Sequence, residues 1–140
     1  MDARAFFYEF GRVLYHIDAY YGEFAKNSGV SPALLWVLYA LNDGKSHTQI
    51  EISNDWDLPK TTVNTIVKEL QQKAYVELVA IKGKRREMTI ELTVSGKKYA
   101  DDLLSKLYEK ENDVYHDLQL DKYEIITLLE KIALKLKEDK

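Results

Sequence analysis

Hydroxyl, amide and ammonium groups gather on one short stretch of the chain, at a spacing that would place them together on a helix. They are Lys60, Thr61, Thr62, Asn64, Thr65 and Lys68. Threonine can hydrogen-bond a base edge or touch a thymine methyl group, asparagine can form two hydrogen bonds with adenine, and lysine can meet guanine or a phosphate. These residue types therefore suit the reading of DNA bases, with most of the affinity supplied by phosphate contacts.

An apolar stripe in the same stretch indicates the helix that must position these groups. The stripe consists of Val63, Ile66, Val67 and Leu70. Spacings of three and four residues put them on one face that enters the core and turn the polar side chains outward, with Thr62 near the boundary. Pro59 favours a helix start, and the helix is expected to end at about Gln72 or Lys73. Any surface helix shows polar residues outward, so this pattern alone leaves both a solvated surface and a DNA-binding face open.

A basic segment follows this helix directly. Residues 74–81 and 87–92 alternate apolar and polar side chains, as half-buried strands do, and a glycine-containing tip joins them. The cations of the tip are Lys82, Lys84, Arg85 and Arg86. A merely solvated tip would more commonly carry mixed charge, and an arginine there can enter a minor groove or clamp the backbone. The hairpin therefore favours a DNA-binding surface.

The distribution of charge supports the same interpretation. From Lys60 to Lys98 there are nine basic residues against four acidic ones, a local charge of +5 in a chain whose formal net charge is −3. The remainder must carry −8. A basic middle flanked by acidic ends is the electrostatic footprint expected for a polyanion when the flanks have another role.

The composition excludes several classes of function. The chain of 140 residues contains no cysteine, which rules out disulfides, thiolate metal sites and nucleophilic thiols and favours a reducing compartment. Neither a leader peptide nor an apolar run long enough to span a membrane is visible, so a cytoplasmic protein is expected. The phosphate-cradle, nucleophile-elbow and zinc-hydrolase motifs are absent, and the sequence predicts no enzyme.

A group of acidic residues and a histidine near the C-terminus could in principle hold a metal. They are Glu109, Asp113, His116 and Asp117. Their spacing would suit zinc or manganese, but a solvated acidic helix explains it better. His16 and His47 have no visible ligand companions in the sequence. We therefore predict neither a metal nor another cofactor.

The flanking segments predict the rest of the fold. A long amphipathic helix is expected from Ala3 to Lys26, and a second helix, apolar nearly all round, from Ser31 to Gly44. A short third helix starts at Ser46 or Thr48, and the residues expected to face inward are Ile50, Ile52 and Trp56. Two more helices follow the hairpin, the first capped by Thr93 or Ser95 and the second with a stripe from residue 125 to 136. The fold class is mainly α (α+β), a helix-turn-helix with a hairpin between long helices.

The stretch from Ser46 to Gly96 resembles the winged helix-turn-helix of MarR-type bacterial transcription regulators. The likeness lies in "TQIEISNDWDLPKTTVNTIVKELQQKAYVEL" and in "KRREMTIELTVSG", which is close to the family's D-x-R wing tip and L-T-x-x-G. It implies a recognition helix over residues 59–73, a wing over 82–87 with Arg86 as the wing arginine, and Thr48 and Gln49 near backbone phosphate. The family's wing aspartate falls at Lys84, which leaves Arg86 without its usual acidic partner. Ala74 stands where many relatives carry glycine, which indicates a different helix exit.

The resemblance also organises the whole chain. It implies one MarR-like domain over residues 1–140, a DNA-binding lobe at 31–96, and dimerisation helices at 1–30 and 97–140. Two-fold pairing would present two recognition helices to a palindromic operator on double-stranded DNA. The expected function is a homodimeric, sequence-specific repressor. The alternative is a winged-helix module that binds proteins instead of DNA.

Aromatic residues in the first two helices leave one question open. They are Tyr8, Tyr15, Tyr20, Tyr21, Trp36 and Tyr39. MarR-like proteins often bind small aromatic effectors between the dimerisation region and the DNA-binding lobe. Aromatic residues at helical spacing more often belong to a core or an interface. The sequence therefore leaves open whether a small aromatic effector binds, and it identifies no pocket residue.

Overall fold

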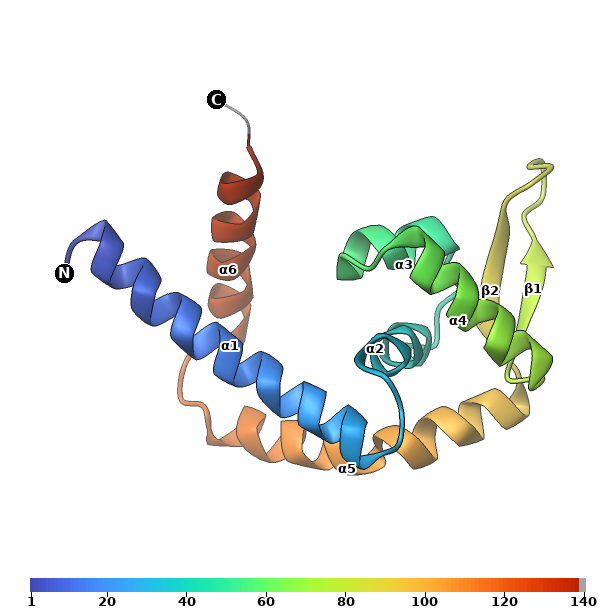
Figure 1. Cartoon of the computed structure of the whole chain (residues 1–140), viewed down its shortest axis with the longest axis horizontal. Coiled ribbons are helices and arrows are strands. Elements are labelled where there is room, and N and C mark those ends of the chain that lie inside the picture. The colour runs from blue at the N-terminus through green and yellow to red at the C-terminus, as the bar shows by residue number, and fades with distance from the viewer. Residues whose placement is uncertain (139–140) are drawn as a thin grey trace. The chain divides into compact units, whose positions relative to one another are not determined.

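A computed structural model of the chain describes residues 1–138 and divides into two compact units, Met1–Ser105 and Lys106–Lys140. Its elements are α1 (Ala3–Asn27), α2 (Pro32–Leu41), α3 (Gln49–Trp56), α4 (Lys60–Gln72), β1 (Val76–Ala80), β2 (Met88–Leu92), α5 (Val94–Asp117) and α6 (Lys122–Lys137). Figure 1 shows this order, with six helices and one hairpin over the described residues. The predicted fold class, a mainly helical winged helix, is confirmed.

Side-chain caps explain where several helices begin. The Ser31 hydroxyl accepts a hydrogen bond from the Leu34 N–H at 3.1 Å, with Pro32 in the first turn of α2. The Thr48 hydroxyl accepts from the Glu51 N–H at 3.1 Å, which settles the start of α3 in favour of Thr48 over Ser46. Each cap satisfies a backbone donor that the first helical turn leaves unpaired. The second helix ends at Leu41, three residues before the predicted stop at Gly44.

The core of the first unit is built around α2, as its nearly continuous apolar sequence predicted. The largest side chains in it that are fully buried are Leu35, Val37, Leu38, Ile52, Val63, Val67, Ile90 and Leu104. They come from α2, α3, α4, β2 and α5, so one cluster of aliphatic side chains holds the helix-turn-helix against the strand. Burial on this scale is the main force that fixes these elements together.

Two side chains of α3 do not face the core as expected. Ile50 is 52% exposed, whereas Ile52 is buried. Residues two positions apart lie on opposite sides of a helix, so both could not face inward, and the sequence prediction for Ile50 was wrong. Trp56 is 36% exposed, and its ring stacks on Trp36 of α2 with centroids 5.2 Å apart. It therefore covers the core edge instead of entering it.

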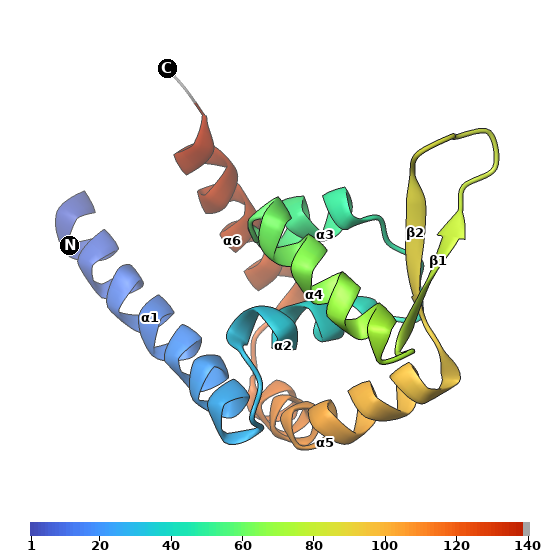
Figure 2. The same ribbon diagram turned by 45° about the vertical axis from the view of Figure 1, so that its right-hand side comes forward.

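The hairpin is a two-stranded antiparallel ribbon that projects away from α3 and α4, as the rotated view in Figure 2 shows. Its register pairs Val76 with Leu92 and Leu78 with Ile90. Gly83 has φ +85°, a conformation that glycine adopts without steric cost, and it allows the tip to turn. Ile90 is the one strand residue between Met88 and Leu92 that is fully buried, so it anchors β2 in the core.

A close joint connects the exit of α4 to the start of α5. The Thr93 hydroxyl donates to the Ala74 carbonyl at 2.6 Å and accepts from the Gly96 N–H at 3.0 Å, so Thr93 caps α5. A Cβ at Gly96 would overlap the Tyr75 carbonyl oxygen, so a side chain has no room there. The Tyr75 and Tyr99 rings stack with centroids 4.4 Å apart. These contacts explain the threonine and glycine of the L-T-x-x-G motif.

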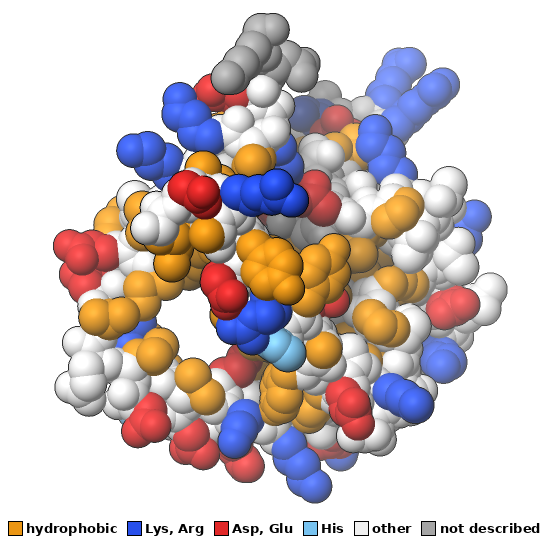
Figure 3. All heavy atoms as spheres, turned by 60° about the vertical axis from the view of Figure 1, so that its left-hand side comes forward, with side chains coloured by type: hydrophobic (Ala, Val, Ile, Leu, Met, Phe, Trp, Pro, Cys, Tyr) orange, Lys and Arg blue, Asp and Glu red, His pale blue; other side chains and the backbone are white. Residues whose placement is uncertain are grey.

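The first and last helices carry apolar side chains at the surface. In α1 the exposed ones are Phe6, Phe7, Tyr8, Val13, Leu14, Tyr15, Ile17 and Tyr20, and only Ala25 of this helix is buried. In α6 they include Ile126, Leu128, Leu134 and Leu136, and no described residue of α6 is buried. Figure 3, which turns the side of α1 forward, shows hydrophobic side chains among charged ones at the surface. Exposed apolar stripes of this kind mark interaction surfaces.

Candidate nucleic-acid interface

The structure divides α4 into the two faces that its sequence predicted. Its four apolar anchors, Val63, Ile66, Val67 and Leu70, are at most 6% exposed. The exposed polar residues are Lys60, Thr61, Thr65, Lys68, Glu69, Gln71 and Gln72. Thr62 and Asn64 are half-buried, so both lie at the edge of the polar face. The helix is thus fixed by its core side, and its polar face is open to a partner.

Hydrogen bonds distinguish the polar side chains of this face from one another. The Thr65 hydroxyl donates to the Thr61 carbonyl at 2.9 Å, so its hydrogen is already in use and its methyl group and lone pairs remain for a base. The Asn64 amide makes no hydrogen bond to another residue among those the structure describes. Asn64 therefore offers a donor and an acceptor together, which is the pattern that adenine requires in the major groove.

The turn between α3 and α4 is held by a buried hydroxyl. Ser53 is a buried polar residue, and its hydroxyl donates to the Leu58 carbonyl at 2.6 Å, while the Leu58 N–H donates back to the Ser53 carbonyl at 3.1 Å. Asp57, between them, has φ +49°. These bonds satisfy the polar groups that a tight turn would otherwise leave unpaired. The angle at which α4 leaves α3 is thereby fixed.

The wing and the start of α3 enclose a hollow of about 440 Å³. Its walls are formed by Thr48, Gln49, Ile50, Glu51, Leu78, Arg86, Glu87 and Met88. The structure thus brings Thr48 and Gln49 close to Arg86, although these residues are far apart in the sequence. It also explains why Ile50 is exposed, because that side chain lines the hollow instead of the core.

Some cations of the basic middle segment are neutralised by ion pairs, and among the described residues most of those on α4 and the wing are not. Lys97 and Lys98 pair with Asp101 and Asp102 at 3.1 Å and 3.0 Å. Hydrogen bonds from Asn42 and from Lys97 hold the pKa of Asp101 below its ordinary value. The cations that form no ion pair with any residue in 1–138 include Lys60, Lys68, Lys82, Arg85 and Arg86. These cations of α4 and the wing therefore keep their charge available to a polyanion.

Lys84 occupies the position at which the MarR-like pattern places the wing aspartate. Its ammonium group pairs with Glu87 at 3.1 Å, across the base of the tip. Arg86, whose usual acidic partner would occupy position 84, makes no ion pair within the described part of the chain. The guanidinium therefore keeps all its donors available, and a phosphate can take the place of the missing aspartate.

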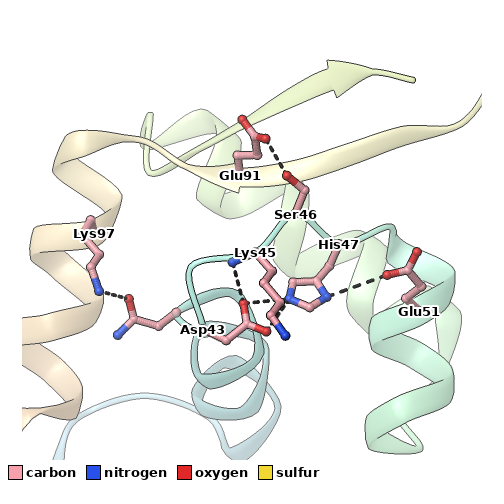
Figure 4. Close-up of polar contacts among 8 residues, drawn as sticks. Asp43, Lys45, Ser46, His47, Glu51, Glu91 and Lys97 are labelled. Carbon is pink, nitrogen blue, oxygen red and sulfur yellow. Dashed lines mark hydrogen bonds and ion pairs between the residues drawn. The ribbon is translucent and has the colours of Figure 1, made fainter. Parts of the chain in front are cut away.

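The root of the wing contains side chains that are not among the predicted site residues. The Ser46 hydroxyl donates to Glu91 of β2 at 2.6 Å, and the His47 ring lies between Asp43 and Glu51, as Figure 4 shows. His47 has no metal-ligand companions in the sequence, so sequence reasoning alone gives it no place in the site. The signal in the sequence is the pair of carboxylates, Asp43 and Glu51, that stand four residues before and four residues after it.

Neither a metal cluster nor a membrane span is found in the described residues. Between residues 1 and 138 no group of three or more His, Cys, Asp or Glu side chains is arranged to hold a metal ion. None of the helices in that range is both long and apolar enough to cross a membrane. The acidic candidates from Glu109 to Asp117 all lie on α5.

Comparisons with known proteins agree with this geometry. Residues 28–87 match a family model described as MarR family. A MarR family regulator from Neisseria meningitidis shares 27% identity at a TM-score of 0.79, with 92% of each chain covered. The transcriptional regulator BldR from Sulfolobus solfataricus shares 18% at 0.75, covering 96% of this chain and 99% of its own. Staphylococcus aureus MarR in complex with salicylate and kanamycin shares 17% at 0.68, covering 98% and 94%. A search of curated proteins found no match.

Proposed function

We propose that this chain, which belongs to the MarR family of transcription regulators, is a homodimeric repressor that binds double-stranded DNA sequence-specifically. In this proposal α4 of each protomer enters a major groove, and the wing, residues 82–87, lies on the minor groove or backbone. The family consists of regulators and not of enzymes. The protein is expected in the cytoplasm. Its expected target is a palindromic operator, because two identical subunits related by a two-fold axis bind two DNA half-sites that are related by the same symmetry.

The observation that carries the proposal is the combination of faces on α4. Four apolar side chains anchor the helix in the core, the unpaired Lys60 and Lys68 face outward, and the free Asn64 amide lies at the edge of the polar face. In the proposal Thr62, Asn64 and Thr65 read bases, and Lys60 and Lys68 hold phosphate. Thr48 and Gln49 at the start of α3 add backbone contacts.

Dimerisation is supported by the apolar surfaces of the terminal helices. A single helix-turn-helix reads few base pairs, so two copies are needed for useful specificity. The exposed phenylalanines, valine, leucine and isoleucine of α1, and the exposed leucines of α6, would be costly if left in water. We assign residues 1–30 and 97–140 to the dimer contact, of which 139 and 140 lie outside the described residues, and residues 31–96 to the DNA-binding lobe.

A small aromatic effector is included in the proposal as the signal that relieves repression. A cluster of aromatic rings links Tyr21, Trp36, Tyr39 and Trp56, with centroid separations between 4.9 and 5.8 Å. Staphylococcus aureus MarR binds salicylate, which is an aromatic acid. Aromatic rings prefer such edge and stacked contacts. We nominate no pocket residue for the effector.

A protein-binding module without DNA affinity is the competing function. Such a module would be expected to carry acidic or apolar side chains on α4 and the wing. The exposed cations there are Lys60, Lys68, Lys82, Lys84, Arg85 and Arg86, and they outnumber the exposed acids Glu69 and Glu87, which favours a polyanion. A binding experiment separates the two functions directly.

The test is the retention of fragments of the organism's own genome across a series of salt concentrations. We expect selective retention at low salt that falls steeply as salt rises, because each phosphate contact releases counterions. Lys82→Ala with Arg85→Ala should flatten the slope, whereas Lys97→Ala with Lys98→Ala, an equal loss of charge at internally paired positions, should leave it steep. Absent or salt-insensitive retention by the unmodified protein would overturn the proposal.

A further inference from the structure

One histidine joins the wing to the helix-turn-helix. The backbone of His47 forms an isolated bridge to Ile90 of β2, in which the Ile90 N–H donates to the His47 carbonyl at 2.7 Å and the His47 N–H donates back at 3.5 Å. The next residue, Thr48, caps α3. His47 is therefore the point at which the middle of β2 is tied to the segment that starts the first helix of the DNA-binding motif.

The ring of this histidine is placed between two carboxylates. Its Nε2 lies 2.9 Å from both carboxylate oxygens of Asp43, and its Nδ1 lies 3.8 Å from an oxygen of Glu51. The His47 side chain is only 16% exposed. A neutral imidazole carries a hydrogen on one nitrogen alone and turns a lone pair outward from the other. Both carboxylates are attracted only when the ring carries both hydrogens and a positive charge.

The other charged groups at the root of the wing do not replace the attraction between a protonated His47 ring and the carboxylates of Asp43 and Glu51. The Lys45 N–H donates to Asp43 at 2.9 Å, and Glu91 of β2 accepts from the Ser46 hydroxyl, as Figure 4 shows. Partial desolvation acts to raise the pKa of Asp43, but the hydrogen bond from His47 and the contacts with Lys45 outweigh it and leave that pKa below its ordinary value. The carboxylates of Asp43, Glu51 and Glu91 face only the positive charge of Lys45 among the groups labelled in Figure 4 besides Lys97. Lys97 is paired with Asp101 on α5. A neutral ring therefore leaves negative charge in excess.

We propose that His47 is a positioning residue whose protonated ring, held between Asp43 and Glu51, fastens the root of the wing to the start of α3, so that DNA binding strengthens as the pH falls. The proposal rests on the DNA-binding function proposed above. If both DNA binding and protonation of His47 favour the fastened wing, each must favour the other, so DNA binding is accompanied by uptake of a proton. The gain in affinity is present when the ring is protonated and is lost when a rise in pH makes the ring neutral.

Affinity for one selected genomic fragment, measured between pH 5.5 and pH 8.5 at fixed ionic strength, tests the proposal. We expect binding to be roughly three- to tenfold tighter at the acidic end, because each protomer contributes one partly exposed charge cluster. His47→Gln should remove this dependence. His16→Gln and His116→Gln, which replace the other two histidines, should keep it whatever their absolute affinities. A profile that is flat in the unmodified protein, or unchanged in His47→Gln, overturns the proposal.

A second variant covers the case in which His47→Gln does not fold. Asp43→Asn keeps an oxygen acceptor for the Lys45 N–H and removes the carboxylate charge that faces the ring, so it should shrink the pH dependence. A merely structural role for Asp43 predicts an equal loss of affinity at every pH. A full pH dependence in folded Asp43→Asn contradicts the proposal.

Amide hydrogen exchange of the protein without DNA separates this proposal from the one on which it rests. Protection of the Ile90 N–H, which donates to His47, should fall as the ring loses its charge and should not vary with pH in His47→Gln. If no DNA fragment is retained at any pH, the DNA-binding proposal fails. The pH dependence of the protection of the Ile90 N–H then still shows whether protonation of His47 fastens the wing. Protection that is independent of pH in the unmodified protein overturns the fastening itself.

Discussion

Helix α4 and the tip of the wing are both basic and lie close together in sequence, yet they are anchored in opposite ways. The helix has four side chains in the core, each at most 6% exposed. Every residue from Lys82 to Met88 is exposed. Reading a base edge requires donors and acceptors in fixed positions, whereas attracting a phosphate requires mainly charge. We therefore expect specificity to reside in α4 and general affinity in the wing.

Removing one core anchor of α4 should have the largest effect. Leu70→Ala removes a buried side chain and leaves a cavity, so we expect the free energy of unfolding to fall by about 2–5 kcal/mol, measured by urea denaturation. Gln71→Ala, at an exposed neighbouring position, should change it by less than about 0.5 kcal/mol. Equal effects of the two substitutions would show that the packing of α4 does not anchor it.

The amide of Asn64 should affect discrimination between DNA sites more than it affects stability. Asn64→Ala removes the free donor and acceptor at the edge of the polar face, so discrimination between a selected fragment and random DNA should fall by about 1–3 kcal/mol. Competition binding measures it, with Gln72→Ala at the end of the helix as the control. If Asn64→Ala keeps the site preference, base reading lies elsewhere and the division between helix and wing is wrong.

Arg86 should show the opposite behaviour. Arg86→Ala is expected to weaken binding to all sequences by about 1 kcal/mol per wing and to lower the slope against salt by about 0.9 for each phosphate that the protein no longer neutralises. Fluorescence anisotropy with specific and random duplexes over a salt series measures both. Weakening confined to the specific duplex would assign base reading to the wing and remove the contrast with α4.

Periodicity predicted most of the helices and strands because it reports which face of each element is buried. The anchors of α4, the alternating strands and the apolar α2 all follow from local spacing, and the caps at Ser31 and Thr48 follow from residue type. The error at Ile50 arose where two apolar residues compete for one short helix, since only the position of the wing decides which of them faces the core.

The finer features of the candidate site depend on contacts between distant residues. The backbones of His47 and Ile90 meet only after the hairpin folds back on the α2–α3 segment, and no local sequence pattern predicts this bridge. The engaged hydroxyl of Thr65 depends on a rotamer that residue type does not fix. The joint of Tyr75 with Gly96 and Tyr99 likewise requires the three-dimensional fold, although the motif around Gly96 hinted at it.

The exit of α4 carries the smallest expected effect, because a change there alters the helix without touching its polar face. Ala74 has φ +60°, a left-handed conformation that costs an L residue about 1–2 kcal/mol and glycine almost nothing. Part of the gain is cancelled because glycine makes the unfolded chain more flexible, so Ala74→Gly should stabilise the protein by roughly 0.5–1 kcal/mol, measured by urea denaturation. Site preference and salt slope should not change, because α4 keeps its anchors. A stabilised variant with altered site preference would instead mean that this strained exit sets the orientation of the helix on DNA, and that the core alone does not fix the reading face.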